Sequence, residues 1–195
     1  MMKKLLLASG SRYRRDLLNR LGLPFTAVAP LVDETPEPGE HPAALAARLA
    51  AEKAMKLASA GTVAIGSDQV ASLDGELLEK PGGRVLALAQ LEACQGRIVV
   101  FHTAVAVHDG AADRLHEHVD LTLVRFACRS RSELERYLEV EPAYDCAGGF
   151  KVEGLGITLF ESIESKDPTA LIGLPLIWLT GALREAGLDP LGPGV

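Results

Sequence analysis

The stretch that most constrains the fold lies at residues 8–15 and reads Ala-Ser-Gly-Ser-Arg-Tyr-Arg-Arg. It follows an apolar run at residues 5–7 and precedes a helical pattern of leucines at residues 16–21. This order predicts a buried strand, a turn of small residues and the start of a helix. Ser11 is expected to be the N-cap residue, because its hydroxyl can accept hydrogen bonds from backbone N–H groups of the first turn.

Three arginines, Arg12, Arg14 and Arg15, crowd that first turn. A helix N-terminus carries partial positive charge, so each arginine is mildly unfavourable there unless an anion lies in front of it. Backbone N–H groups, serine hydroxyls and guanidinium groups at one helix start suit phosphate oxygens. The alternative is that the arginines extend into solvent or pair with Asp16 and with the acidic residues 33–34. The pattern favours a phosphate site.

Composition limits the classes of function. With 195 residues, 48% of them hydrophobic, the chain can bury the core of one domain or of two small lobes that share a cleft. A net charge of −6 argues against a broad nucleic-acid surface, so any phosphate site must be local. No stretch is long and apolar enough to span a bilayer. Cys94, Cys128 and Cys146 form no paired motif, which suits a cytoplasmic protein.

Two charged segments follow the first helix. Residues 30–40 are rich in proline and acid and predict a loop that carries Asp33 and Glu34. Adjacent carboxylates on a loop can hold a hard divalent cation, or they can simply solvate the loop. Residues 42–60 predict a helix, and Lys53 lies on it. The position of Lys53 along this helix is by itself compatible with a solvated side chain.

An aspartate follows the next apolar run. Residues 62–66 predict a buried strand, and Asp68 comes at its carboxyl end. A carboxylate in that place is costly unless something pairs with it, and ligands gather at the carboxyl ends of strands in open α/β sheets. Asp68 is therefore the candidate acid of the site, and a turn-capping aspartate is the alternative.

The rest of the chain predicts further strands and helices. We expect strands at residues 98–107, 115–126 and 157–163, and helices at residues 84–94, 130–140 and 173–187. Lys80 falls on an irregular loop before the first of these helices. Residues 145–156 are rich in glycine and allow a close approach of the backbone to a ligand. They match neither a Walker A motif nor a dinucleotide fingerprint.

Several short motifs occur in one order along the chain. They are SGSRYRR at residues 9–15, DE at 33–34, EKA at 52–54, IGSD at 65–68, KP at 80–81, AG at 147–148 and GLPL at 173–176. Together, over residues 3–190, they resemble the Maf-like nucleoside triphosphate pyrophosphatases. The residues Ser-Asp-Gln at 67–69 and the segment CAGGFKVEG at 146–154 resemble the branch that acts on 7-methyl-GTP.

The resemblance implies a fold and an activity. The implied fold is α/β, an elongated mixed β-sheet with flanking helices in two lobes around a central cleft, related to the inosine triphosphate pyrophosphatases. Residues 1–195 are expected to form a single domain. Such enzymes use a divalent metal, Mg²⁺ or Mn²⁺, and hydrolyse a nucleoside triphosphate to the monophosphate and pyrophosphate.

The resemblance also implies roles for single residues. Asp68 corresponds to the catalytic proton acceptor, and Glu34 lies towards the metal. The residues that correspond to phosphate-binding positions are Ser9, Ser11, Arg14, Arg15, Lys53 and Lys80. One departure concerns Arg12, which stands where the family has proline and bears on the conformation of the loop.

Selectivity for the base depends on other residues. A 7-methylguanine base carries a delocalised positive charge, which an aromatic face and a carboxylate suit well. Tyr13 is expected to stack on the base, Glu153 to accept hydrogen bonds from the guanine edge, and Gln69 to supply amide hydrogen bonds. A plain exposed residue at a helix start is the alternative for Tyr13.

Two other functions remain open at this point. One is a pyrophosphatase of the same family that acts on pyrimidine nucleotides such as dTTP or UTP. The other is a nucleotide-binding regulator of septum formation without catalysis. The expected partner is a nucleoside triphosphate substrate rather than nucleic acid or membrane, and a homodimer is plausible from the family.

Overall fold

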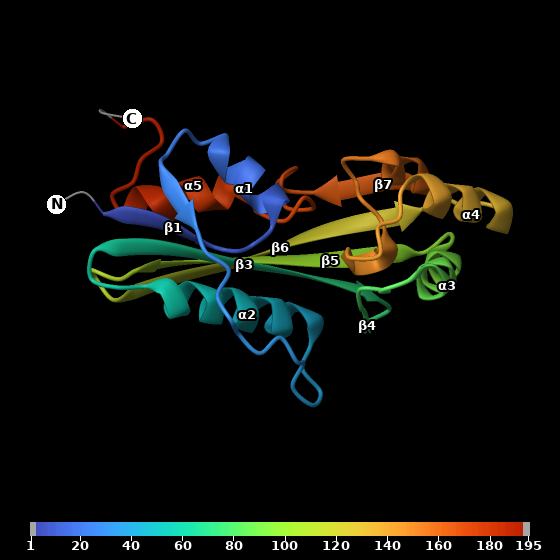
Figure 1. Ribbon diagram of the computed structural model, residues 1–195, viewed down its shortest axis with the longest axis horizontal. Helices are drawn as coiled ribbons and strands as arrows, with labels where there is room; N and C mark the ends of the chain where they lie inside the picture. Colours follow the sequence, from blue (N-terminus) through green and yellow to red (C-terminus); the bar gives the residue numbers. More distant parts are fainter. Residues whose placement is uncertain (1–2, 193–195) are drawn as a thin grey trace.

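The computed structural model describes residues 3–192, which form a seven-stranded mixed sheet with helices on both faces (Figure 1). The strands are β1 (Lys4–Ala8), β2 (Phe25–Ala27), β3 (Thr62–Leu73), β4 (Glu76–Leu78), β5 (Ile98–Asp109), β6 (Arg114–Phe126) and β7 (Phe160–Ser165). Their order is β2-β1-β3-β5-β6-β7, with β4 paired to β3. Strand β1 pairs in parallel with β2 and β3, and the remaining pairs are antiparallel. The mixed α/β sheet predicted from the sequence is confirmed.

Five α-helices flank the sheet. They are α1 (Arg12–Asn19), α2 (Pro42–Leu57), α3 (Arg84–Cys94), α4 (Arg131–Val140) and α5 (Leu176–Glu185), with short 3₁₀ turns η1 (Ala147–Gly149) and η2 (Leu155–Leu159). Helix α2 covers one face of the sheet, and α1 and α5 lie on the other face at the β1 end (Figure 1). Helices α3 and α4 lie at the opposite end. Within the described range, no helix is both long and apolar enough to cross a membrane.

The hydrophobic core is divided between the two ends of the molecule. One cluster joins α1 and α5 to β1, with Leu7, Leu17 and Leu179 fully buried. The other joins α3 and α4 to the far ends of β5 and β6, around Phe101 and Phe126. The long strands β3, β5 and β6 run through both ends and connect the two clusters. The fold therefore has two lobes on one continuous sheet, as the sequence predicts.

Helix α2 approaches the sheet closely because small residues line the contact. Ala50 and Ala54 pack over the sheet together with alanines of β5. A Cβ atom on Gly66 of β3 would lie 2.6 Å from the backbone nitrogen of Ala54 and would collide with the carbonyl oxygen of Ala50. Only glycine therefore allows this separation, which sets the position of α2 relative to β3.

The structure differs from the sequence-based prediction at several element ends. Helix α5 spans Leu176–Glu185 rather than residues 173–187. Strand β3 continues to Leu73 rather than ending near Gly66, because β5 supplies pairing partners along its whole length. Helix α2 ends at Leu57, three residues earlier than predicted. The predicted strand at residues 157–163 is a 3₁₀ turn up to Leu159 and becomes β7 only from Phe160.

Contacts with distant residues account for that last difference. The carboxylate of Glu141 accepts a hydrogen bond from the backbone N–H of Gly156 at 3.0 Å. Gly156 also lies against the backbone of Lys151, with no room for a Cβ atom. The guanidinium of Arg129 donates to the carbonyl of Thr158 at 2.8 Å. These interactions hold the segment as a turn, although its β-branched residues favour a strand.

Candidate active site

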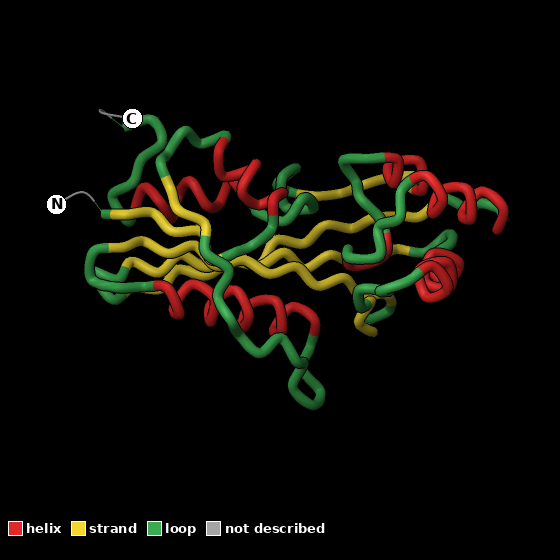
Figure 2. Tube along the Cα trace, in the orientation of Figure 1, coloured by secondary structure: helices red, strands yellow, loops and turns green. Residues whose placement is uncertain are grey.

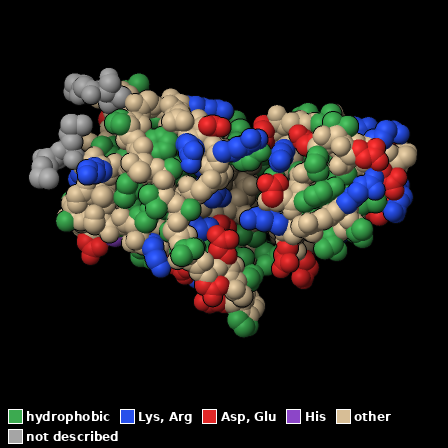
Figure 3. Space-filling view, in the orientation of Figure 1, with side chains coloured by type: hydrophobic (Ala, Val, Ile, Leu, Met, Phe, Trp, Pro, Cys, Tyr) green, Lys and Arg blue, Asp and Glu red, His purple; other side chains and the backbone are tan. Residues whose placement is uncertain are grey.

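A cavity of about 840 Å³ lies where the two lobes meet. Figure 3 shows a hollow in the middle of the molecule with Lys, Arg, Asp and Glu side chains at its rim. All the residues predicted for the site except Arg15 line it, namely Ser9, Ser11, Tyr13, Arg14, Glu34, Lys53, Asp68, Gln69, Lys80 and Glu153. The structure therefore collects in one cavity residues that span most of the sequence.

The small-residue turn between β1 and α1 is held by its own serines. The hydroxyl of Ser9 accepts a hydrogen bond from the backbone N–H of Ser11 at 3.1 Å. The hydroxyl of Ser11 accepts from the backbone N–H of Arg14 at 3.4 Å, so Ser11 is the N-cap residue, as predicted. Arg12 is the first residue of α1, a position that also suits proline, so the helix starts normally despite this departure from the family.

Arg14 connects this turn to a loop far along the chain. Its Nε donates to the carbonyl of Gly173 at 2.9 Å, and its Nη1 to the hydroxyl of Ser9 at 3.4 Å. Burial lowers the pKa of the Arg14 guanidinium, and the charges of Asp68 and Glu34 oppose that effect. Because a guanidinium has five N–H donors, Arg14 keeps donors for an anion in the cavity.

Arg15 is the one predicted residue that the structure does not bring to the cavity. Its side chain is exposed and lines a separate recess beside Asn19 and Phe25. Arg14 lines the cavity together with Arg12 and Tyr13, whereas Arg15 lies on the side of α1 that carries Asn19, four residues later. A run of basic residues in the sequence carries no information on which of them points inward.

Lys53 lies at the centre of the charged part of the cavity. Its Nζ is 2.6 Å from Oε1 of Glu34 and 2.7 Å from Oδ1 of Asp68. Only 8% of the Lys53 side chain is exposed, so the interpretation of a solvated lysine is wrong. The hydrogen bond from Lys53 lowers the pKa of Glu34 against the opposing effect of burial. One ammonium thus contacts two carboxylates from different segments.

Asp68 faces the cavity from inside β3 rather than from the end of the strand. Strand β1 pairs with β3 only as far as Ala8 and Gly66. Beyond Gly66, one edge of β3 has lost its parallel neighbour while the other edge stays paired with β5. Asp68 lies next to this opening and lines the cavity. The expectation of a strand end and the alternative of a turn cap are both wrong, because the opening is made by the end of β1.

The two carboxylates form a donor set that fits a divalent metal. Glu34 and Asp68 supply hard oxygen ligands, and both contact the ammonium of Lys53. Among residues 3–192, no group of three or more His, Cys, Asp or Glu side chains could hold a metal by itself. Mg²⁺ commonly binds through one or two carboxylates together with phosphate oxygens of a substrate. The residues present therefore suit a metal that arrives with a phosphorylated ligand.

Lys80 adds another cation at the rim. It lies on the irregular loop between β4 and α3, as predicted, and its side chain is exposed. Its charge contributes to lowering the pKa of Glu34, after the larger effect of Lys53. Lys80, Lys53 and Arg14 thus place positive charge around one end of the cavity.

The other end of the cavity combines an aromatic ring with mixed charges. The guanidinium of Arg12 lies 4.8 Å from the centre of the Tyr13 ring, and its Nη2 donates to the Tyr13 hydroxyl at 3.1 Å. Glu153 reaches this end from the glycine-rich segment. The Tyr13 ring can therefore bind a cation on its face, since Arg12 already does so.

Gln69 uses its amide nitrogen within the protein. The Nε2 atom lies 2.9 Å from the hydroxyl of Thr103, and 3.1 Å and 3.0 Å from the carbonyls of Ala170 and Leu171. An amide nitrogen has two hydrogens, so these contacts occupy it, and the Oε1 acceptor is what Gln69 can offer to a ligand. Gln69 also braces a wall of the cavity, because Leu171 belongs to the lining.

Some lining residues were missed by sequence reasoning. They are Phe101, Asp145, Cys146, Phe150, Lys151, Val152, Leu171 and Ile172. The glycine-rich character of residues 145–156 was a signal for part of this set. Burial raises the pKa of the Cys146 thiol to about 11, so this thiol stays neutral in the cavity wall. The phenylalanines had no signal, because an apolar residue on a strand predicts only a core position.

Known proteins resemble this chain over nearly its full length. The family model for Maf-like protein matches residues 4–186. A protein named 7-methyl-GTP pyrophosphatase from Xanthomonas oryzae pv. oryzae (strain KACC10331 / KXO85) is 58% identical over 189 residues, which is 96% of this chain and 98% of that protein. Proteins of the same name from Bordetella pertussis and Ralstonia nicotianae are 56% and 54% identical, cover 96% and 95% of this chain, and are themselves covered to 94% and 96%.

A solved structure is also similar. The HAM1 protein from Coxiella burnetii has 18% sequence identity and a TM-score of 0.48, over 66% of this chain and 75% of that one. The family match and the identities above place the chain without it. With the predicted motifs gathered in one cavity and the family model spanning residues 4–186, this chain belongs to the Maf-like protein family.

Proposed function

We propose that this protein is a nucleoside triphosphate pyrophosphatase that hydrolyses 7-methyl-GTP to the nucleoside monophosphate and pyrophosphate. The observation that carries the proposal is Lys53 between Glu34 and Asp68, inside a cavity with further cations at its rim. The names of relatives that are 54–58% identical over nearly the whole chain support this choice of substrate.

The cationic end of the cavity is proposed to bind the triphosphate. Arg14, Lys53 and Lys80 would neutralise phosphate oxygens, and Ser9 and Ser11 border the same turn. Charge-assisted hydrogen bonds from guanidinium and ammonium groups are well suited to this task. The phosphate-binding role predicted for Arg15 stays a prediction from the family resemblance, and its position outside the cavity favours the other three cations.

Asp68 is proposed to accept a proton from the attacking water. The water oxygen forms a bond to the α-phosphorus, and the bond from that phosphorus to the oxygen that bridges to the β-phosphorus breaks. The water proton passes to Asp68, and pyrophosphate leaves with the bridging oxygen. Lys53 contacts Oδ1 of Asp68, so Oδ2 is the oxygen proposed to accept the proton.

Glu34 would hold the divalent metal, Mg²⁺ or Mn²⁺, together with phosphate oxygens of the substrate. When bound, the metal supplies positive charge that stabilises the charge developing on the phosphate oxygens. Lys53 contacts both carboxylates and would hold them in place before substrate arrives. The positive charge of Lys53 offsets part of the repulsion between the two acidic side chains.

Base selectivity is assigned to the other end of the cavity. The cationic 7-methylguanine ring would replace the guanidinium of Arg12 on the face of Tyr13. Glu153 would accept hydrogen bonds from the guanine edge, and Gln69 would contribute its Oε1 acceptor. Neutral guanine lacks the positive charge, so GTP would bind this end less tightly.

The remaining parts of the proposal concern the state of the protein. We infer that residues 1–195 act as one domain, because the cavity takes residues from both lobes. The described cysteines are all free, in keeping with the proposed cytoplasmic location. The nucleoside triphosphate is the proposed partner, and a homodimer remains a prediction from the family resemblance.

A substrate panel with product analysis tests the function. Purified protein with Mg²⁺ or Mn²⁺ is given 7-methyl-GTP, GTP, UTP and dTTP, and phosphate and pyrophosphate are measured separately. The proposal expects pyrophosphate release with the highest kcat/KM for 7-methyl-GTP. A preference for UTP or dTTP would overturn the substrate, and nucleotide binding without turnover would favour the regulator. Orthophosphate as the first product would contradict the reaction itself.

A further inference from the structure

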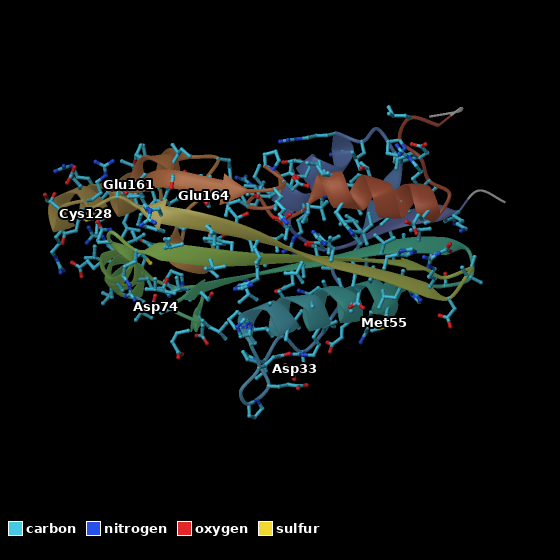
Figure 4. All side chains as sticks on the ribbon, turned by 180° about the vertical axis from the view of Figure 1, so that it is seen from behind. Asp33, Met55, Asp74, Cys128, Glu161 and Glu164 are labelled. Carbon is cyan, nitrogen blue, oxygen red and sulfur yellow. The ribbon has the colours of Figure 1, made fainter. Side chains whose placement is uncertain are left out.

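The segment that carries Glu34 has no helix or strand of its own. Residues 28–41 connect β2 to α2 as one long loop (Figure 2). Figure 4 labels Asp33 in this loop, beyond helix α2. The loop also carries Glu37 and Glu40, so it brings like charges together, and 55% of the Glu34 side chain is exposed. Contacts outside the cavity must therefore help to hold this loop in one conformation.

Arg48 of helix α2 supplies such contacts. Its Nε donates to Oε1 of Glu40 and its Nη2 to Oε2 of Glu40, both at 2.8 Å. The two parallel bonds form the strong bidentate geometry of an arginine with a carboxylate. Nη2 also donates to the carbonyl of Thr35 at 3.1 Å, and Nη1 to Glu52 at 3.3 Å. Arg48 thus binds Thr35, which follows Glu34, and Glu40, near the end of the loop, at the same time.

Glu40 in turn forms hydrogen bonds with the backbone of the loop. Its Oε2 accepts a hydrogen bond from the backbone N–H of Glu37 at 3.0 Å, and its own N–H donates to the carbonyl of Glu37 at 3.0 Å. The hydrogen bond from Arg48 lowers the pKa of Glu40 to about 2, so the carboxylate stays ionised near neutral pH. Two sets of contacts therefore hold the part of the loop that follows Glu34. They are the hydrogen bond from Arg48 to Thr35 and the turn between Glu37 and Glu40.

We propose that Arg48 is a positioning residue that holds Glu34 against Lys53. The proposal rests on the proposed function, since it assigns Arg48 a role in that same site. Arg48 and Lys53 belong to one helix, so a single rigid element fixes both the loop and the ammonium that Glu34 contacts. Arg48 is not among the described residues that line the cavity, and it acts only through Thr35 and Glu40.

Matched variants test the proposal. Arg48→Gln and Glu40→Gln each remove the bidentate pair, and Arg48→Lys keeps the charge with one donor group. Arg131→Gln is the control, because Arg131 of α4 also pairs with two glutamates, Glu92 of α3 at 2.8 Å and Glu135 of α4 at 3.0 Å, and does not line the cavity. Hydrogen exchange of the Thr35 and Glu37 amides is measured beside the kinetics with Mn²⁺ and 7-methyl-GTP.

We expect exchange at Thr35 and Glu37 to accelerate roughly tenfold or more in Arg48→Gln and Glu40→Gln, with exchange in β3 unchanged. The KM for the nucleotide and the Mn²⁺ concentration for half activation should rise by a similar factor, while kcat at saturation changes less. Arg48→Lys should restore part of the loss, and Arg131→Gln should match the wild type. The double variant Arg48→Gln/Glu40→Gln should be no worse than either single variant.

Two results would overturn the positioning role. One is wild-type exchange at Thr35 and Glu37 in Arg48→Gln, and the other is an unchanged KM and Mn²⁺ requirement while exchange rises. If Arg48→Gln does not fold, Glu40→Gln carries the same test. A third outcome separates the two proposals: the wild-type protein hydrolyses no nucleotide, but hydrogen exchange still depends on Arg48. That outcome would support the positioning of Glu34 and would reject the proposed function.

Discussion

The ammonium of Lys53 lies 2.7 Å from Oδ1 of Asp68 and joins helix α2 to strand β3 in the interior of the molecule. Both side chains are largely buried, with 8% and 14% exposed. A buried carboxylate is costly unless it is paired, and the same holds for a buried ammonium. Each residue therefore offsets the free-energy cost of burying the other. The pair places the carboxylate of Asp68 at the wall of the cavity.

Asp68→Asn should fold normally and lose turnover. The amide keeps the shape of the side chain but cannot accept a proton, so kcat should fall by about 10²- to 10⁴-fold. Pyrophosphate release from 7-methyl-GTP and a thermal melt measure the two effects. Asp74→Asn is the control, because Asp74, which Figure 4 labels, is exposed in the turn that follows β3 and does not line the cavity. Near wild-type rates in Asp68→Asn would remove Asp68 from the mechanism.

Lys53→Met should weaken nucleotide binding as well as turnover. The change deletes a charge-assisted donor to phosphate and leaves Glu34 and Asp68 without their shared cation. Losing a hydrogen bond to a charged group should reduce kcat/KM by roughly 10- to 200-fold. Lys56→Met is the matched control, since Lys56 is exposed on the same helix. Equal kcat/KM in the two variants would contradict the central position of Lys53.

Gly66→Ala should destabilise the fold and disturb the site together. The new methyl group would collide with the backbone of α2 at Ala50 and Ala54 and force the helix away from β3. Overpacking of this kind costs about 1–3 kcal/mol of unfolding free energy, or more where backbone must move. Urea unfolding and kcat/KM are the measurements. Gly61→Ala, where a Cβ meets nothing within 4 Å, should be neutral.

Tyr13 should decide the preference for a cationic base through its ring rather than its hydroxyl. Replacing it with leucine removes a cation–π contact of about 0.5–2 kcal/mol, so the ratio of kcat/KM for 7-methyl-GTP to that for GTP should fall roughly 2- to 30-fold. Tyr13→Phe keeps the ring and should keep the ratio. A ratio that survives in Tyr13→Leu would show that the base lies elsewhere in the cavity.

The stability of the protein should fall as the pH drops below about 6.5 because of His102. Burial lowers the pKa of this side chain from 6.5, and nearby His41 adds to the effect. Below pH 6.5 the unfolded chain therefore binds more protons at this position than the folded chain, so unfolding becomes easier as pH falls. His102 contacts Ser72 at 3.2 Å and is not among the described residues that line the cavity.

Urea unfolding of the wild type and of His102→Gln at pH 7.5, 6.5 and 5.5 measures this dependence. The glutamine variant cannot titrate, so its unfolding free energy should change less between pH 6.5 and 5.5. Parallel pH profiles for the two proteins would show that other groups cause the slope.

Local pattern was sufficient for much of the fold. The turn after β1, the Ser11 cap and the helix from Arg12 follow from contacts between residues a few positions apart. Helix α3 has the predicted bounds, and α4 begins after Ser130, where a helix was predicted and where a capping box of Ser130 and Glu133 forms. Family membership, predicted from short motifs in one order, is confirmed by the match over residues 4–186.

The sequence by itself thus determined the kinds of element and most of the charged and polar residues proposed for the site, since hydrophobic period, caps and motifs are local properties. Only the tertiary structure decided which residues meet. It turned Arg14 into the cavity and Arg15 away from it, and it buried Lys53 between Glu34 and Asp68. These outcomes depend on the close approach of α2 at Gly66 and on where β1 stops beside β3. Such contacts join segments far apart in the chain, and no local pattern carries their geometry.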